Sequence, residues 1–534
     1  MGSPDHPSRQ PGNRDLEAAW AYHNATKHTY HSVRVGPRGL DWDNQPIPYK
    51  IYTTLEPLPL PRDLPLPHTP ALEAIASRLP DAGMPGASVP DLPTLASVLF
   101  LSAGITRRLR LPDGSTMPFR AAACTGALYH IELYVVCGDL PGLAAGVYHF
   151  SVHDFALRRL RAGDWRPTLV AATAQEPAIA RAPAIVVCTT TFWRNAWKYR
   201  DRAYRHAFWD CGTILANLLA VAAGAGLPAR VVCGFVDGDV NRLLDLDTHR
   251  EVAIVLVALG RESAPPGVRA TTGDADGLPP PPPLGLPTAP LSAREVDYPA
   301  IRAMHAASSL TAAEEVRAWR GTPPAASPPP TGPLVPLRPL PADAWPQDSI
   351  TRVIRRRGSS RRFQRAAITF AELSTVLERA TGGVPADFLE PADGTPTLVD
   401  VYLIAHAVDG LSPGAYVLHR QRHALELLRP GAFRRQAGYL ALEQPLAADA
   451  SVNVYCLADL SPILARFGNR GYRAAQLEAG ITGGRIYLAA YALGLGATGL
   501  TFYDDDVTAF FSPHAAGKSV LFLTAVGHPV RRAR

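Results

Sequence analysis

The chain has 534 residues, of which 47% are hydrophobic and 19% are charged. This balance excludes an intrinsically disordered chain, and the length suits two ordinary domains. The net charge of +6 is spread over scattered arginines, so it favours anionic ligands only weakly and gives no reason to expect nucleic acid.

The sequence shows no sign of export or of a membrane span. The first 14 residues lack the apolar run of a signal peptide, and there is no uninterrupted apolar stretch of about 18 residues. The cysteines, which form no CxxC pair and have no metal-ligand spacing, are Cys124, Cys137, Cys188, Cys211, Cys233 and Cys456. We therefore expect a cytoplasmic protein with reduced thiols and no membrane partner.

A proline-rich segment divides the chain. Residues 264–347 contain LPPPPPLGLP, TPPAASPPPTGP and VPLRPLPADAWP, which favour extended polyproline geometry. Within this segment, residues 291–320 have helical apolar spacing and are expected to dock on a domain. The predicted organisation is a first domain over 20–263, a linker over 264–347 and a second domain over 348–534.

The two flanking regions resemble each other in sequence. Residue types recur at a constant offset of 268 positions over about a hundred residues. The matched pairs are Gly126 and Gly394, Tyr134 and Tyr402, Gly142 and Gly410, Gly146 and Gly414, Tyr148 and Tyr416, Pro177 and Pro445, Cys188 and Cys456, Tyr204 and Tyr472, Arg205 and Arg473, Gly212 and Gly480, and Gly226 and Gly494. Such an unbroken register predicts a duplicated domain.

Each copy shows the same order of predicted elements. In the first half they are a helix over 94–103, strands over 127–137, up to Tyr148 and around Cys188, a helix over 204–224 and a strand over 250–260. In the second half they are 370–380, 398–408, up to Tyr416, around Cys456, 472–493 and 518–527. This order predicts an α+β fold, with a mixed sheet flanked by helices in each half. Two such halves would pack about a pseudo-two-fold axis, with a ligand at their seam.

The strongest local signal is IRRRGSSRRF at residues 354–363. Arg357, Ser359 and Arg361 form an R-x-S-x-R spacing ahead of a helix. Alternate residues of an extended segment share a side and arginine donates in a planar fork, so the three can converge on one phosphate. A solvated arginine-rich turn would produce the same run, and both interpretations stay open on these residues alone.

Two motifs imitate nucleotide sites. Gly494, Gly496 and Gly499 spell G-x-G-x-x-G, but here the motif ends a helix and opens an extended segment, the reverse of a dinucleotide fold. HAAGKS at 514–519 imitates a phosphate loop, but Ser512 stands where the first glycine is required. We predict neither site.

Two groups of possible metal ligands also lack the right pattern. His23, His28 and His31 have no zinc spacing and indicate an N-terminal arm that lies on the domain. Three adjacent carboxylates at residues 504–506 cannot all face one ion, so we expect a solvated turn or a helix cap. No metal is predicted.

The R-x-S-x-R spacing followed by phenylalanine resembles the phosphate motif of the FMN-dependent nitroreductase superfamily. In the first half, FRAAACTGALYHIELYVV (119–136), PGLAAGVYHF (141–150) and WKYRDRAYRHAFWDCG (197–212) resemble its azoline-oxidase branch, the SagB-type dehydrogenases of thiazole and oxazole peptide biosynthesis. The resemblance covers about 20–263 and 348–530. It implies two tandem nitroreductase-like domains in an intramolecular pseudo-dimer that binds FMN.

The resemblance also implies a site shared by the two halves. Phosphate would bind to Arg357, Ser359 and Arg361, with charge added by Arg531. The ring would lie against Ala123, Cys124, Thr125 and Gly126, and the amides of Gly499, Leu500 and Thr501 would approach its reactive edge. The family usually has serine with proline or alanine at 122–125, so backbone amides and the Thr125 hydroxyl are the expected contacts here. Residues 78–92 of the first half contain no R-x-S-x-R, which predicts one FMN per chain.

Lys198 and Tyr199 resemble the Lys-Tyr pair that this branch uses for proton handling near the flavin. The duplicate positions hold Arg466 and Phe467, which cannot titrate near neutrality, so only the first half would keep proton transfer. A lysine with a lowered pKa beside a tyrosine could take the proton that accompanies hydride loss. A surface lysine next to a core tyrosine is the alternative.

These features predict an FMN-dependent dehydrogenase that oxidises a peptide-like or heterocyclic substrate, of the azoline-to-azole type, in natural-product biosynthesis. One alternative is an NAD(P)H-fed reductase of nitro, quinone or ene substrates. Another is a flavin-free docking or recognition partner in a biosynthetic complex. The expected partner is a small molecule or a peptide, free or bound to a carrier or leader, and further pairing of whole chains is left open.

Overall fold

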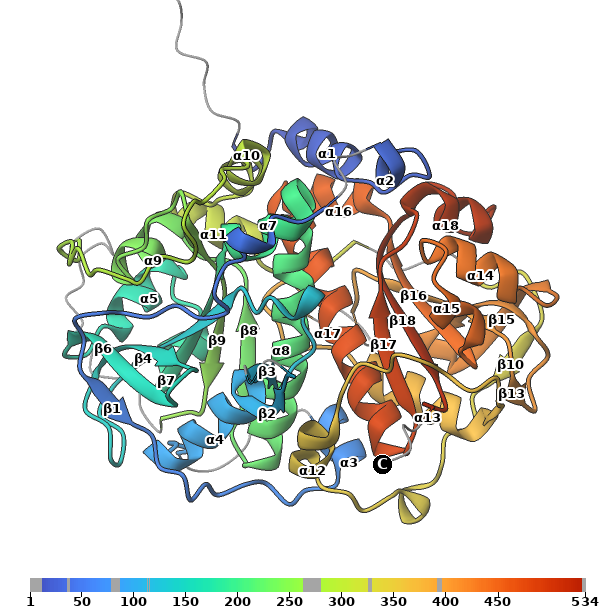
Figure 1. Ribbon diagram of the computed structural model, residues 1–534, viewed down its shortest axis with the longest axis horizontal. Coiled ribbons are helices and arrows are strands. Elements are labelled where there is room, and N and C mark those ends of the chain that lie inside the picture. The colour runs from blue at the N-terminus through green and yellow to red at the C-terminus, as the bar shows by residue number, and fades with distance from the viewer. Residues whose placement is uncertain are drawn as a thin grey trace, which may run out of the picture.

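The computed structural model describes residues 12–35, 39–77, 87–112, 114, 116–262, 280–324, 329–390 and 396–530. The first large sheet contains β1 (Pro57–Pro59), β4 (Ile131–Cys137), β5 (Gly146–Ser151), β6 (Ala156–Ala162), β7 (Ala184–Thr191), β8 (Ala229–Val232) and β9 (Glu251–Leu259). The second contains β10 (Leu334–Pro336), β12 (Asp400–Ala405), β14 (Gly414–His419), β15 (Ala424–Pro430), β16 (Val452–Ala458), β17 (Gly496–Leu500) and β18 (Ser519–Gly527). The two sheets belong to two domains that lie side by side (Figure 1).

Helices flank both sheets. Those of the first domain are α3 (Ala71–Ala76), α4 (Leu92–Ala103), α5 (Arg166–Ala172), α6 (Pro177–Arg181), α7 (Phe192–Tyr199), α8 (Ala203–Gly224) and α9 (Asp237–Leu243). Those of the second are α12 (Ile350–Arg356), α13 (Phe370–Thr381), α14 (Arg434–Leu440), α15 (Pro445–Asp449), α16 (Leu460–Phe467), α17 (Arg470–Ala492) and α18 (Asp504–Phe511).

The two sheets have the same strand order. It is β1-β6-β5-β4-β7-β9-β8 in the first domain and β10-β15-β14-β12-β16-β18-β17 in the second. Equivalent strands keep the sequence offset, since β5 begins at Gly146 and β14 at Gly414, 268 positions later. The prediction of a tandem α+β pseudo-dimer is therefore confirmed.

One detail of the sheets differs from the prediction. Every described pairing within the two large sheets is antiparallel, whereas a mixed sheet was expected. The strands β7 and β8 run in the same direction, but β9 lies between them and pairs antiparallel with both. The same holds for β16 and β17 around β18, so strands of equal direction never become neighbours.

The repeated glycine and tyrosine positions have one structural cause. A Cβ on Gly146 or Gly414 would lie 2.8 Å from a carbonyl oxygen of the neighbouring strand, so only glycine fits at the start of β5 and β14. Two residues later, the hydroxyls of Tyr148 and Tyr416 donate to the carbonyls of Ala144 and Ser412, at 2.8 and 2.6 Å. The preserved sequence register therefore reflects a preserved turn.

The helices α8 and α17 pack against each other at the centre of the molecule (Figure 1). A Cβ on Gly212 would lie 2.6 Å from the backbone of Gly480, its duplicate, so the glycine pair lets the two helices approach closely. The run Phe192–Gly224 is long and apolar enough to cross a membrane, but 89% of its 18-residue apolar window is buried inside the molecule. It is a core element shared by the domains.

Reciprocal ion pairs join the two domains. Each of two buried carboxylates is bound by two arginines of the other domain, at 2.6 to 3.0 Å: Arg202 and Arg205 with Asp504, and Arg470 and Arg473 with Asp237. Burial raises the pKa of both carboxyls, but the arginines outweigh it and hold each pKa at about 2. Asp504 stands in the first turn of α18 but is 3% exposed, so the expectation of a solvated turn is wrong for this residue.

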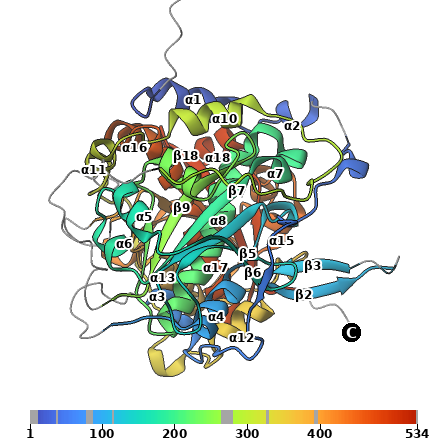
Figure 2. The same cartoon turned by 90° about the vertical axis from the view of Figure 1, so that its left-hand side faces the viewer.

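The N-terminal arm and the linker both pack on this junction, where α1 (Leu16–Ala25) and α10 (Pro299–Ala307) contact each other. The arm contains α1 and α2 (Ser32–Val35). It contacts the second domain where His23 lies 3.2 Å from the Tyr472 hydroxyl, and the first where the Tyr22 hydroxyl donates to the Asp201 carbonyl. Within 291–320 the linker forms α10 and α11 (Ala313–Trp319), with Trp319 fully buried. Figures 1 and 2 show α10 beside α1.

A two-stranded ribbon stands away from the body of the first domain (Figure 2). It pairs β2 (Ile105–Arg110) with β3 (Thr116–Arg120). The chain then returns from the ribbon to the seam at Arg120, where the segment predicted to line a flavin begins.

Candidate functional site

The loop of residues 120–130 joins β3 to β4 at the seam. Sequence periodicity predicted a strand from residue 127, but β4 begins at Ile131. Gly126, Ala127 and Tyr129 have φ values of 64°, 56° and 51°, which no strand accommodates. Left-handed backbone at a non-glycine residue costs about 1–3 kcal/mol, so the surrounding structure must hold this loop in place.

The carboxylate of Asp210 on α8 holds the loop. It accepts the backbone N–H of Thr125 at 2.9 Å and the Thr125 hydroxyl at 2.8 Å. The thiol of Cys124 donates to it at 3.1 Å, and His130 Nε2 lies 2.9 Å away. Asp210 is 4% exposed, so these bonds form away from water and fix the loop firmly.

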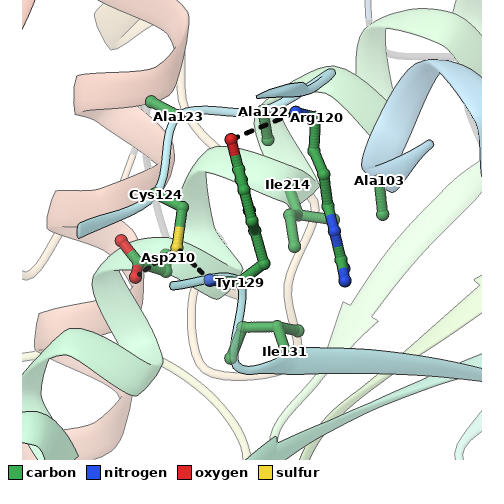
Figure 3. A pocket seen from close by; sticks show the side chains of 9 residues that line it. All are labelled: Ala103, Arg120, Ala122, Ala123, Cys124, Tyr129, Ile131, Asp210 and Ile214. Carbon is green, nitrogen blue, oxygen red and sulfur yellow. Dashed lines mark hydrogen bonds between the residues drawn. The ribbon is translucent and has the colours of Figure 1, made fainter. Parts of the chain in front are cut away.

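Figure 3 shows the same loop from inside the domain. The backbone N–H of Tyr129 donates to Cys124 Sγ at 3.1 Å, and the Tyr129 hydroxyl accepts from the Arg120 N–H at 3.2 Å. A small cavity beneath the loop is lined by Ala103, Arg120, Ala122, Ala123, Cys124, Tyr129, Ile131, Asp210 and Ile214. The side chains of Cys124 and Tyr129 thus brace the loop from below.

This arrangement decides what the loop can offer to a ligand. Burial and the negative charge of Asp210 raise the pKa of the Cys124 thiol well above its usual range, so the residue is a packed thiol. The Thr125 hydroxyl already donates to Asp210 and cannot donate to a ring as well. Among the described residues, the peptide N–H groups of Ala123, Cys124 and Gly126 have no protein acceptor, so they are among the donors that the loop can offer to a ligand.

The R-x-S-x-R segment of the second domain meets this loop across the seam. Arg357 donates to the backbone carbonyls of Ala121 and Arg120, at 3.0 and 3.1 Å. The hydroxyl of Ser359 lies 3.1 Å from that of Tyr487, which also accepts the Gly499 N–H. Tyr487 thereby brings Ser359 and Gly499 together next to Arg357.

Arg361 differs from its neighbours in the segment. Its side chain is exposed and has no hydrogen bond or ion pair within the described part of the chain. Its positive charge nevertheless acts on the pKa of Tyr199 in the first domain, so the guanidinium reaches toward the seam. The structure therefore leaves one complete guanidinium of the segment available for an anion.

The strand β17 supports the arginine segment. The N–H of Ser360 donates to the Ala497 carbonyl at 2.9 Å, and a Cβ on Gly496 would lie 2.3 Å from Ser360 Oγ. Gly499 is exposed, with no atom closer than 3.6 Å to a Cβ placed there. Leu500 is half-buried, and the Thr501 hydroxyl lies 3.1 Å from His28 Nδ1 of the N-terminal arm.

Two predicted features lie outside the described residues. Arg531 is one, but the preceding Val530 donates its N–H to the Arg362 carbonyl at 3.1 Å, so the chain reaches the arginine segment just before it. The other is most of segment 78–92, of which residues 87–92 are described. The absence of a second phosphate motif therefore remains a prediction from the sequence.

Tyr199 lies at the same seam. A Cβ on Gly126 would be 2.9 Å from its hydroxyl, so the phenol and the loop backbone are in close contact. Burial raises the pKa of Tyr199, Asp210 and Cys124 raise it further, and Arg361 opposes them. Tyr199 therefore faces the side from which the arginine segment arrives. Lys198 is exposed, with Nζ 5.4 Å from the centre of the Tyr199 ring.

The residue after this pair has a strained backbone. Arg200 has φ 51° and ψ −138°, a region that only glycine adopts readily, and its duplicate is Gly468 with φ 65° and ψ −164°. We expect Arg200→Gly to raise the free energy of unfolding by about 1 kcal/mol in urea titrations. Arg200→Ala removes the same side chain but retains the Cβ, so it should give no gain. Equal stability of the two variants would contradict the strain.

Sequence reasoning missed Asp210, the residue that organises the loop. Its duplicate is Glu478, which accepts the Leu398 N–H at 2.7 Å and the Thr397 hydroxyl at 2.6 Å. A carboxylate repeated at the same offset within an apolar helix was the available signal. Both halves thus use a buried carboxylate to hold the segment that leads into the central strand.

Comparisons with known proteins agree with this architecture. The sequence model of the nitroreductase family matches residues 119–261 and 354–528. The crystal structure of a candidate nitroreductase from Anabaena variabilis has a TM-score of 0.74 and 26% identity, covering 96% of this chain and 99% of that one. The structural similarity therefore extends over nearly the whole chain and includes both domains.

Two curated relatives are named as processing proteins of trifolitoxin and of microcin B17. The trifolitoxin-processing protein TfxB of Rhizobium leguminosarum bv. trifolii is 32% identical over 140 residues, 25% of this chain and 38% of that protein. The microcin B17-processing protein McbC of Escherichia coli is 30% identical over 138 residues, 25% of this chain and 50% of that protein. Each match spans half or less of the relative.

Proposed function

Because the chain belongs to the nitroreductase family, we propose that it is an FMN-dependent oxidoreductase with one flavin site at the domain seam. The observation that carries this proposal is the junction between Arg357 of one domain and the carbonyls of Arg120 and Ala121 of the other. It joins the phosphate motif directly to the loop expected to line the ring.

The residues at the seam fit FMN. The ring would find the unpaired N–H groups of Ala123, Cys124 and Gly126, and the open backbone at Gly499 leaves room for its edge. The phosphate would bind to Arg361, with Ser359 and the remaining donors of Arg357 beside it. FMN, when bound, supplies the two-electron chemistry by accepting a hydride.

The side chains next to the loop supply proton handling. The raised pKa of Tyr199 keeps it a neutral phenol near pH 7, so we assign to it a hydrogen bond that orients the reacting group of the substrate. Lys198 lies over the same ring at the solvent boundary, where an amine can pass a proton to water. Asp210 holds the neighbouring loop rigid, and this fixes the position of the Tyr199 phenol relative to the expected site of the flavin ring.

We assign the reaction to the oxidation of azolines to azoles in a peptide-like substrate, as in the SagB-type branch. Similarity to the two peptide-processing proteins supports a peptide substrate, free or bound to a carrier or leader. The Lys-Tyr pair at the intact side of the seam supports oxidation. We also infer a cytoplasmic enzyme; within the described residues, the membrane-length helix is mostly buried inside the molecule.

The FMN clamp can be tested by absorption spectroscopy of purified protein. We expect one FMN per chain in the wild type and at least about tenfold weaker binding in Arg357→Ala and in Arg361→Ala, because each loses a charge-assisted bond to phosphate. Arg355→Ala, an exposed arginine of α12, is the matched control and should bind FMN normally. Full FMN retention in both clamp variants would contradict the assignment.

A reductase is the second candidate, favoured by the similarity to a candidate nitroreductase over nearly the whole chain. Anaerobic mixing distinguishes the two. Flavin bleaching by a thiazoline peptide supports the oxidase, whereas rapid bleaching by NADPH without reaction of the peptide supports the reductase. A protein that stays colourless after incubation with FMN would instead indicate a flavin-free recognition partner.

A further inference from the structure

Three potential metal ligands meet on the outer sheet of the second domain, away from the seam. They are His419 at the end of β14, Glu426 in β15 and His514 in the loop between α18 and β18. One ligand atom from each lies within 4.8 Å of the others. In sequence they span almost a hundred positions, so no spacing motif could have revealed them.

The sheet register places these groups on one face. Tyr402 and Glu426 both pair with Val417, and cross-strand partners point to the same side of a sheet. His419 stands two residues beyond Val417 and therefore shares that side. Its Nε2 lies 2.7 Å from the Glu426 carboxylate. Paired strands thus fix two of the three candidate ligands.

The third ligand has an unsatisfied atom. His514 Nδ1 lies 2.9 Å from the Tyr402 hydroxyl, whereas its Nε2 is buried and has no hydrogen-bond partner. When Nδ1 carries the proton and donates it to Tyr402, Nε2 presents a lone pair to the cluster. An unpaired buried polar atom costs about 1–3 kcal/mol, and an ion would remove that cost.

The carboxylate of Glu426 is also oriented from behind. Its Oε1 accepts the N–H groups of Thr331 and Gly332, which leaves Oε2 facing the histidines. The charge of Lys518 acts on His514, but Lys518 is paired with Asp400 at 2.7 Å, so this charge is compensated. Ligands held by hydrogen bonds from a second layer of residues are typical of protein metal sites.

The Cys124, His130 and Asp210 group offers a contrast. Its ligand atoms also lie within 4.8 Å of one another, but the Asp210 oxygens already accept bonds from Thr125, Cys124 and His130. Glu426 Oε2, by comparison, has one hydrogen-bonding partner among the described residues, and that partner is His419 Nε2, itself a candidate ligand. The outer cluster therefore has the free coordination capacity that the seam cluster lacks.

The first domain has no counterpart to this cluster. At the same offset it has Ser151, Arg158 and Leu246, and Arg158 forms an ion pair with Asp154 at 2.6 Å. The fold therefore does not require a His-Glu-His group at this position. The group distinguishes the second half from the first, as does the arginine segment.

We propose that His419, Glu426 and His514 bind a divalent transition-metal ion, with zinc as the best match to two imidazoles and one carboxylate. Zinc bonds of about 2.1 Å require donor atoms about 3.4 Å apart, so small side-chain movements bring the three into range. The ion would join the β14–β15 hairpin, the loop before β18 and, through Glu426, the linker at Thr331. With three protein ligands, a water molecule would complete the tetrahedron.

Calorimetric titration of chelator-treated protein with zinc sulfate tests this proposal. We expect one zinc per chain, and binding at least about tenfold weaker in His419→Gln and in His514→Gln. His423→Asn, an exposed histidine between the two strands, is the matched control and should bind zinc like the wild type. Circular dichroism of the metal-free variants verifies that they are folded.

Cobalt provides an independent measurement on the unmodified protein. Bound Co²⁺ should give the intense visible absorption of a four- or five-coordinate ion, and one equivalent of zinc should abolish it. Absence of cobalt absorption, or zinc that stays bound in both histidine variants, would overturn the proposal. FMN content should not change with zinc, so this outcome is separate from the flavin test.

Discussion

Asp504→Ala is expected to lower the free energy of unfolding by about 3–5 kcal/mol, the larger of the two stability effects we predict. The substitution leaves the guanidiniums of Arg202 and Arg205 buried without their shared anion. A charge confined without a partner costs far more than the net value of the intact pair. Urea unfolding monitored by circular dichroism measures the loss.

The neighbouring Asp505 is the matched control. Its side chain is 66% exposed and pairs with Lys27 at 2.8 Å, so Asp505→Ala should change stability by less than about 1 kcal/mol. The Asp504 effect should also depend on pH. Because its folded pKa is about 2, below that of an unfolded chain, its contribution is present above pH 4 and is lost as the pH falls toward 2. Equal losses in the two variants would contradict the buried junction.

Tyr199→Phe is expected to lower the rate of substrate oxidation by about 10²–10³-fold while FMN content stays unchanged. The phenol contacts the loop at Gly126, and its raised pKa keeps it a neutral hydrogen-bond donor that can orient the substrate at neutral pH. Anaerobic stopped-flow reduction of the bound flavin by a thiazoline peptide measures the rate directly. This prediction rests on the proposed oxidase function.

The control for this variant is Tyr298→Phe, a half-buried tyrosine of the linker that packs near α7. It removes a phenolic hydroxyl that lies outside the loop. The rate of flavin reduction should therefore stay within about twofold of the wild-type rate. If the Tyr199→Phe enzyme reduces its flavin at the wild-type rate, the proposed role of the Tyr199 hydroxyl in orienting the substrate is wrong. Loss of FMN in that variant would instead assign Tyr199 to flavin binding.

The two-domain architecture could be predicted from the sequence because duplication leaves matching residues at a constant offset of 268 positions. Positions such as Gly146 and Gly414 recur at one offset since each permits the same close backbone approach. The constraint acts on single residues, so it can be seen without coordinates. The arginine segment and the Lys-Tyr pair were singled out differently, by resemblance to a known family, and their roles stay predictions.

The details that sequence reasoning missed depend on contacts between distant segments. Asp210 organises a loop some 85 positions away, and Asp504 is buried by arginines about 300 positions away. Contacts between residues so far apart in the chain produce no recognisable pattern in the neighbouring sequence. The late start of β4 has a different cause, because Ala127 and Tyr129 adopt a backbone that their side chains do not predict.

Fusion of the two halves changes what a single mutation can do. In a homodimer every substitution appears twice, so a residue cannot be lost from one site and kept in the other. Here Tyr199 and its duplicate Phe467 occupy equivalent positions in one polypeptide and vary separately. In a fused chain, a residue of one half can therefore be replaced while its equivalent in the other half is kept. The two halves can acquire different functions without loss of the residues that one site needs.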